Sequence, residues 1–214
     1  PHVGVFSGDH IYKFAIDQMQ TVHEACGADL TIAGWPVPIA EANQFGVMEI
    51  DASGRLIGFE EKPANPKPMP GDPTRALVSM GNYFFRRDAL LDVLAVDAED
   101  ESSAHDFGKN VIPRLLREGA MIQVYDFGTN VVPGERDSTI PYWRDVGTLE
   151  GYFAANMEVR SSLPAVNLYN RQWRIRTAQR DYPPARLVRH SPDHPVTSAI
   201  DSLICEGSIV SSSV

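Results

Sequence analysis

Apolar runs with strand character alternate with segments of helical spacing over residues 3–160, and this alternation leaves few architectures open. Runs of the strand type occupy residues 3–8, 30–37, 46–50, 56–59, 77–85 and 121–127, and helical spacing occupies residues 13–26, 87–96, 106–118 and 148–157. Strands that alternate with helices pack as a sheet covered by helices. The chain is 43% hydrophobic and 22% charged, which is an ordinary globular composition. The sequence therefore predicts an α/β fold with helices on the faces of a sheet.

The net charge of the chain is −9, which argues against a surface for nucleic acid or for an anionic membrane. It does not argue against a nucleotide ligand, because such a ligand needs only a few local cations. No run of about 18 apolar residues is present, so no transmembrane helix is expected, and no signal peptide is found. A length of 214 residues is enough for one sizeable domain and an appendage.

The two cysteines, Cys26 and Cys205, are far apart and match no metal-binding spacing. They are expected to be buried, reduced thiols of a cytosolic protein. The chain opens at Pro1 almost directly into a strand and ends inside a patterned segment. We therefore expect a fragment of a longer protein.

An acid follows the first predicted strand, which ends at Gly8 and is followed directly by Asp9. Ligands bind at the carboxyl ends of strands in open α/β sheets, so Asp9 is a candidate contact for a metal ion or a phosphate-bearing substrate. A second acid, Asp145, ends another short strand within residues 142–147. Two carboxylates presented in this way can share one Mg²⁺, which prefers oxygen ligands. Taken singly, each acid is more often a helix cap or a turn residue.

Glu61 and Lys62 end a strand and enter a loop with five prolines in residues 63–73. Lys62 can meet a phosphate as a point charge held by the rigid loop, or it can be a solvated surface lysine. Glu61 can accept hydrogen bonds from sugar hydroxyls, or it can be a solvated acid without a role. Residues 79–83 place small and polar side chains inside a strand, which favours either a ligand wall or a β-bulge at Gly81.

Asp106 is placed to begin a helix that runs to about residue 118, and the N–H groups at such a start favour anions. Asp106 can also be a simple N-cap, and Lys109, one turn into the helix, can reach a phosphate or only water. Pro113 predicts a kink or break inside this helix. Three histidines show no cluster with metal-ligand spacing: His10, His190 and His194.

The tail of the chain has a different pattern. Periodicity is lost over residues 163–195, where prolines return, and this predicts a long linker. After it, Leu203 and Ile209 lie six residues apart, as do Ile204 and Val210, with small residues between them. Such a repeat is typical of the first coil of a parallel β-helix, and an ordinary hairpin is the alternative.

Six motifs follow one another along the chain. They are Ser-Gly-Asp-His-Ile-Tyr at residues 7–12, Phe-Gly-Val-Met at 45–48, Glu-Lys-Pro-Ala-Asn-Pro at 61–66, Ser-Met-Gly-Asn-Tyr at 79–83, His-Asp-Phe-Gly-Lys at 105–109 and Tyr-Trp-Arg-Asp-Val-Gly-Thr at 142–148. Together they resemble bacterial ADP-glucose pyrophosphorylases (glucose-1-phosphate adenylyltransferases). Residues 167–170 and 173–176 resemble the linker of that family into its β-helix. The Glu-Lys-Pro motif recurs in other sugar nucleotidyltransferases, whereas the full set in this order is specific.

The resemblance implies a Rossmann-like nucleotidyltransferase sheet with helices on both faces, followed by a left-handed parallel β-helix. It divides this chain into the C-terminal part of the catalytic domain (residues 1–161), a linker (162–196) and the start of the β-helix (197–214). It also implies nucleotidyl transfer from ATP to α-D-glucose 1-phosphate, with Mg²⁺ as cofactor, which gives ADP-glucose and pyrophosphate for glycogen biosynthesis. The intact family members are usually allosteric, cytoplasmic homotetramers.

The resemblance also assigns roles to residues. Asp9 and Asp145 would hold the catalytic Mg²⁺, and Lys62 would bind the phosphate of glucose 1-phosphate, so these three are the expected catalytic residues. The expected substrate-binding residues around the sugar and along the same pocket are Glu61, Ser79, Tyr83, Asp106, Phe107, Lys109 and Trp143.

One part of the family pattern is missing, because no glycine-rich nucleotide loop with its Arg and Lys is found in the chain. The chain is therefore expected to carry the sugar-phosphate half of an active site, to lack most of the β-helix and to be inactive alone. Two alternatives stay open. One is a non-catalytic regulatory subunit or fragment that binds a sugar phosphate, and the other is a nucleotidyltransferase that uses another nucleoside triphosphate. Neither nucleic acid nor a membrane is an expected partner.

Overall fold

The computed structural model describes residues 1–135, 141–178, 180–188 and 199–211. The chain forms two compact units. The first unit comprises residues 1–8 and 14–131, and the second comprises residues 9–13 and 132–214. The second unit is therefore built from two segments that are far apart in the sequence. The boundaries predicted at residues 161 and 196 stay a prediction, and residue 196 lies outside the described residues.

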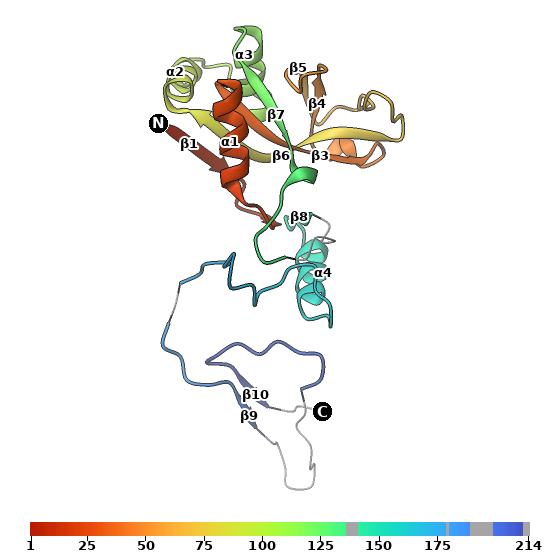
Figure 1. The fold of residues 1–214 in the computed structure, drawn as a ribbon, viewed down its shortest axis with the longest axis vertical. Coiled ribbons are helices and arrows are strands. Elements are labelled where there is room, and N and C mark those ends of the chain that lie inside the picture. Colours follow the sequence, from red (N-terminus) through yellow and green to blue (C-terminus); the bar gives the residue numbers. More distant parts are fainter. Residues whose placement is uncertain (136–140, 179, 189–198, 212–214) are drawn as a thin grey trace. The chain divides into compact units, whose positions relative to one another are not determined.

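The first unit contains a mixed sheet of six strands among the described residues (Figure 1). These are β1 (His2–Phe6), β3 (Leu30–Pro38), β4 (Gly46–Ile50), β5 (Leu56–Glu61), β6 (Arg75–Arg86) and β7 (Ile122–Asp126). The long strand β6 runs antiparallel to β1, β3 and β4, whereas β3 and β7 are parallel. The α/β class predicted from the alternation of strands and helices is thus confirmed.

Helices cover both faces of this sheet: α1 (Ile16–Cys26) one face, α2 (Arg87–Ala98) and α3 (Ile112–Arg117) the other (Figure 1). Successive side chains of a strand point to opposite faces, so Phe84 and Phe85 of β6 mark the two sides. The ring of His23, on α1, packs edge-on against Phe84 with centroids 5.1 Å apart. Phe85 instead joins a buried cluster with Leu90 of α2 and Leu115 of α3.

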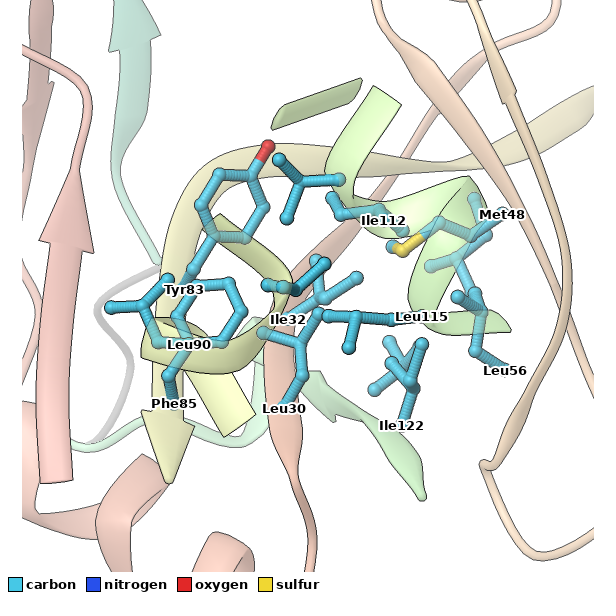
Figure 2. Close-up of a cluster of buried hydrophobic side chains, with 14 residues drawn as sticks. Leu30, Ile32, Met48, Leu56, Tyr83, Phe85, Leu90, Ile112, Leu115 and Ile122 are labelled. Carbon is cyan, nitrogen blue, oxygen red and sulfur yellow. The ribbon is translucent and has the colours of Figure 1, made fainter. Parts of the chain in front are cut away.

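That cluster is the main hydrophobic core of the first unit (Figure 2). Its members come from five strands and from both helices of one face, and they include Leu30, Ile32, Met48, Leu56, Tyr83, Phe85, Leu90, Ile112, Leu115 and Ile122. Burial of each large apolar side chain contributes roughly 1.5–3 kcal/mol to folding. The strands that precede the predicted site residues are therefore anchored in a packed core.

The polar interruption of β6 is a β-bulge. Tyr83 pairs with Ile32 and Ser79 pairs with Gly34, so the register between β3 and β6 shifts around Gly81. Gly81 has φ = 70°, a left-handed conformation that glycine adopts without a Cβ penalty. The predicted bulge is confirmed, and a ligand wall at the same residues stays a prediction.

The helix predicted over residues 106–118 is present in two pieces. A π-helical turn (Phe107–Val111) comes first, and α3 follows it at Ile112. Pro113 lies in the first turn of α3, where a missing backbone N–H does no harm. The predicted break is therefore confirmed, but it falls before the proline and not at it.

The second unit holds the short antiparallel pair of β2 (His10–Tyr12) and β8 (Trp143–Asp145). It also holds α4 (Leu149–Val159), whose N-cap is Thr148. The Thr148 hydroxyl accepts a hydrogen bond from the Gly151 N–H at 3.0 Å. The sequence predicted no strand directly after Asp9, where β2 begins.

A parallel pair of three-residue strands, β9 (Arg186–Val188) and β10 (Ile209–Ser211), ends the described part of the second unit. Ile209 and Val210, from the six-residue repeat, lie in β10. Because its partner is parallel and more than 20 residues away, β10 is not part of a tight hairpin. A β-helix beyond this pair stays a prediction.

The expectation that the two cysteines are buried was wrong, because Cys26 and Cys205 are free and exposed. The side chains of β1 are exposed or half-buried, and among the described residues β1 pairs only with β6. Within the described part of the chain, no helix is long and apolar enough to span a membrane.

Candidate functional site

The register of β2 and β8 brings the two predicted metal acids together. His10 lies opposite Asp145, and the Val146 N–H donates to the Asp9 carbonyl oxygen at 2.9 Å. Ligand atoms of Asp9, His10 and Asp145 all lie within 4.8 Å of one another. Residues 136 positions apart in the sequence thus form one acidic cluster inside the second unit.

His10 belongs to this cluster, although its spacing in the sequence indicated no metal site. Its Nε2 lies 3.6 Å from an oxygen of Asp9 and 3.9 Å from an oxygen of Asp145. On the other side of the ring, the indole N–H of Trp143 donates to Nδ1 at 3.3 Å. A pairing of residues 10–12 with 143–145 would have revealed this contact, but three-residue strands give little signal in a sequence.

Gly147 keeps the space beside the two acids open. Its N–H donates to an oxygen of Asp145 at 2.7 Å and so fixes that carboxylate. A Cβ at Gly147 would lie 3.1 Å from Asp145 Oδ1 and 3.3 Å from Asp9 Oδ2. Because both carboxylates are exposed and only hydrogens occupy this position, a cation and its water ligands can approach them.

A second group of predicted residues gathers in the first unit around Glu61. The Glu61 carboxylate lies against the backbone of two glycines: a Cβ on Gly46 would be 2.9 Å from Oε2, and one on Gly108 only 2.3 Å. Burial raises the pKa of Glu61, and the charge of Asp106 raises it further, whereas the ammonium groups of Lys62 and Lys109 oppose the rise. The charges of four predicted site residues are therefore close enough to influence one another.

Aromatic side chains form the buried side of this group. The rings of Tyr83 and Phe107 are stacked, with centroids 5.6 Å apart and planes 25° apart. Burial raises the pKa of Tyr83, while a hydrogen bond with Ser79 opposes the rise. Ser79 and Tyr83 are both buried, so these two polar residues of the β6 bulge are bonded to each other in the interior.

Two charged residues are held at the rim by their backbones. Lys62 has φ = 48°, and its N–H donates to the Phe45 carbonyl oxygen at 3.0 Å, so the exposed side chain leaves from a fixed turn. Asp106 caps the π-helical turn by accepting from the Lys109 N–H at 2.8 Å. The N-cap alternative for Asp106 is confirmed, and a role of Asp106 and Lys109 toward a ligand stays a prediction.

The structure thus brings seven predicted residues together in the first unit: Glu61, Lys62, Ser79, Tyr83, Asp106, Phe107 and Lys109. It brings the remaining three, Asp9, Trp143 and Asp145, together in the second unit. The other histidines considered, His190 and His194, lie outside the described residues.

Comparison with known proteins shows which proteins this chain resembles. A family model described as "Nucleotidyl transferase" matches residues 1–162. The chain is 50% identical over 209 residues to a protein of Thermus thermophilus named "Glucose-1-phosphate adenylyltransferase", with 98% of this chain and 50% of the relative covered. A protein of an Anaeromyxobacter species with the same name is 49% identical over 209 residues, which cover 97% of this chain and 51% of the relative. The chain therefore spans about half the length of these curated relatives.

Proposed function

The chain belongs to the nucleotidyl transferase family, and we propose that it forms part of the active site of a glucose-1-phosphate adenylyltransferase. The observation that carries the proposal is the pairing of Asp9 and Asp145 in one cluster, beside an open glycine position. The high identity to relatives of that name supports the choice of activity. In this reaction an oxygen of glucose 1-phosphate attacks the α-phosphorus of ATP in line, a P–O bond forms, and pyrophosphate leaves without a covalent enzyme intermediate.

The acidic cluster fits Mg²⁺. The indole N–H of Trp143 can only donate, so Nδ1 of His10 accepts and a neutral His10 carries its proton on Nε2. That nitrogen then faces Asp9 and Asp145 as a donor and not as a ligand. The two carboxylates remain as oxygen ligands, which Mg²⁺ prefers. When bound there, Mg²⁺ supplies positive charge that neutralises phosphate oxygens.

The first unit supplies the contacts for glucose 1-phosphate in this proposal. Lys62 pairs with the phosphate, and its fixed turn reduces the freedom that binding removes. Glu61 accepts hydrogen bonds from sugar hydroxyls, while Tyr83 and Phe107 present an apolar face to the ring. Asp106 and Lys109 border the same space. We assign no residue of this chain to the adenine base, so the choice of ATP among nucleoside triphosphates rests on the named relatives.

Other features of the proposed enzyme rest on the same relatives. A place in glycogen synthesis, a homotetramer, allosteric regulation and a cytoplasmic location follow from the family resemblance and stay predictions. The contribution of the β-helix to assembly is part of the same proposal.

The replacement Asp145→Asn tests the proposed function. In the protein made from the complete reading frame that encodes this chain, the variant should lose about a thousandfold in kcat, because one of the two carboxylates that would hold Mg²⁺ is gone. The far-ultraviolet circular dichroism spectrum should not change, since Asp145 is exposed. Asp92→Asn, an exposed acid on α2, is the matched control and should keep full activity.

Two results would contradict the proposal. One is an unmodified protein that binds glucose 1-phosphate but forms no ADP-glucose from ATP, which would favour the regulatory subunit or another nucleoside triphosphate. The other is an Asp145→Asn variant with unchanged turnover.

A further inference from the structure

A buried acid outside the predicted site holds the turn that precedes Asp106. Asp97, in the last turn of α2, is only 2% exposed. Its two carboxylate oxygens accept from the Ser103 hydroxyl at 2.7 Å and from His105 Nδ1 at 2.9 Å. The Ser103 hydroxyl oxygen in turn accepts from the His105 N–H at 3.0 Å. These three hydrogen bonds close a ring, so the buried charge of Asp97 is compensated mainly by the 103–105 turn, and the nearby guanidinium of Arg114 on α3 adds to this.

The backbone of His105 shows that this turn is held in place. Its φ is 53°, a left-handed conformation that residues other than glycine adopt rarely and only where the surroundings enforce it. The His105 side chain is 58% exposed, so its ring stays at Asp97 although water is available to it. The hydrogen bonds to Asp97 lower the pKa of that acid, so Asp97 is ionised at neutral pH.

The residues directly after His105 contribute to the proposed sugar-phosphate site. Asp106 is the next residue and caps the π-helical turn. Phe107 stacks on Tyr83, and the backbone of Gly108 lies against the carboxylate of Glu61. The backbone angles of His105 therefore set the direction in which the turn from Phe107 leaves. The helix α2, which carries Asp97, is fixed because its residues Leu90 and Val93 lie in the core.

We propose that Asp97 and His105 form a positioning pair, which holds the Asp106–Lys109 turn in the geometry that binds glucose 1-phosphate. The pair does not touch the substrate, and it acts through Asp106 and Phe107. The inference rests on the proposed function of the same turn. A purely structural pair would affect stability alone, whereas a positioning pair affects the affinity for the sugar phosphate and leaves the affinity for ATP unchanged.

Three replacements of His105 separate the side-chain bond from the backbone. His105→Gly removes the bond but adopts φ = 53° without strain. His105→Ala removes the bond and also disfavours this φ, and His105→Asn keeps a donor and tolerates the left-handed region. In the protein from the complete reading frame, His105→Ala should raise the KM for glucose 1-phosphate about tenfold or more, with the KM for ATP within about twofold of the unmodified value. His105→Gly should show a smaller rise, and His105→Asn should restore most of the affinity.

Asp100→Asn is the matched control. Asp100 lies in the same turn region and accepts from the Ser102 hydroxyl at 2.6 Å and from Arg114 at 2.8 Å, but within the described residues no hydrogen bond joins it to His105 or Asp106. Its replacement should leave the KM for glucose 1-phosphate unchanged. Asp97→Asn combined with His105→Ala should be no worse than His105→Ala alone, because both remove the same bond.

Calorimetric binding of glucose 1-phosphate provides a second readout that needs no turnover. If the unmodified protein binds the sugar phosphate and all His105 variants bind it equally well, the positioning role is wrong while the proposed function stands. The positioning role is also wrong if the His105 variants lose thermal stability but bind glucose 1-phosphate as tightly as the unmodified protein. If the unmodified protein does not bind glucose 1-phosphate, the proposed function fails, and this inference fails with it.

Discussion

Two histidines of the first unit occupy opposite environments. His23 is 1% exposed, and its Nδ1 lies 2.8 Å from the Thr31 hydroxyl oxygen. His105 is mostly exposed and donates to a buried acid. Burial lowers the pKa of His23, and the neighbouring His2 lowers it further. At the residue scale, burial and not residue type favours the neutral form of His23 in the folded state.

The buried His23 predicts a loss of stability in mild acid. Its pKa is lower in the folded protein than in the unfolded chain, so the unfolded chain takes up the proton first. Stability is therefore unaffected by this group above the unfolded pKa of about 6.5 and falls as the pH drops below it. His23→Gln should reduce the difference between the urea midpoints measured at about pH 7.5 and about pH 5.5. An unchanged difference would assign the acid sensitivity to other groups.

At the scale of elements, the π-helical turn explains how the half-buried Glu61 can lie in the proposed sugar site. The turn brings the Gly108 backbone against Glu61, and no side chain could fit between them. Pro113 does not distort it, because the proline lies in the first turn of the following helix. Residues 106–109 are therefore presented by an irregular turn whose two ends are fixed by Asp97 and by the core residue Ile112.

Gly108→Ala should move Glu61 without unfolding the protein. The new Cβ would lie 2.3 Å from Glu61 Oε2 and 2.7 Å from its Cδ, and these atoms end a flexible side chain that can rotate away. We expect a KM for glucose 1-phosphate that is raised about tenfold, with a melting temperature close to that of the unmodified protein. Adding Glu61→Asp shortens the acid and relieves the contact, so the double variant should be less impaired than the sum of the single changes. Strict additivity would show that Glu61 and Gly108 are not in contact.

At the scale of the whole molecule, the main hydrophobic core and the proposed metal site belong to different units. The hydrophobic core lies in the first unit, and the acidic cluster lies in the second. Phe85 is fully buried in the core beside the stacked rings of Tyr83 and Phe107, whose centroids are 6.2 Å and 5.9 Å away. The same core thus supports the aromatic side of the proposed sugar site.

Phe85→Ala should destabilise the protein by about 3–5 kcal/mol, since it leaves a cavity in a packed interior. Most domains are stable by only about 5–15 kcal/mol, so the urea midpoint should fall steeply. Leu91→Ala is the control, because Leu91 is 51% exposed on α2 and should change the midpoint little. Equal effects of the two replacements would contradict the described core.

Features that depend on neighbours along the chain could be predicted from the sequence. The alternation of strands and helices follows from residue type and local spacing, and the structure contains it. The N-cap at Asp106 and the bulge at Gly81 were each one of two alternatives from the sequence, and the structure contains both. The motifs likewise pointed to the nucleotidyl transferase family, which the matching family model confirms. Local patterns suffice here because helix periods, caps and turns are short-range properties.

Which side chains meet in the fold could not be predicted without the tertiary structure. His10 joins Asp9 and Asp145 through the register between two three-residue strands. Asp97 and His105 meet across a turn that has no periodic sequence pattern. The exposure of Cys26 and Cys205 also depends on what packs against them and not on their own preference for burial. Such contacts are set by long-range packing, whose free energy comes from many buried side chains together, so no short stretch of sequence specifies them.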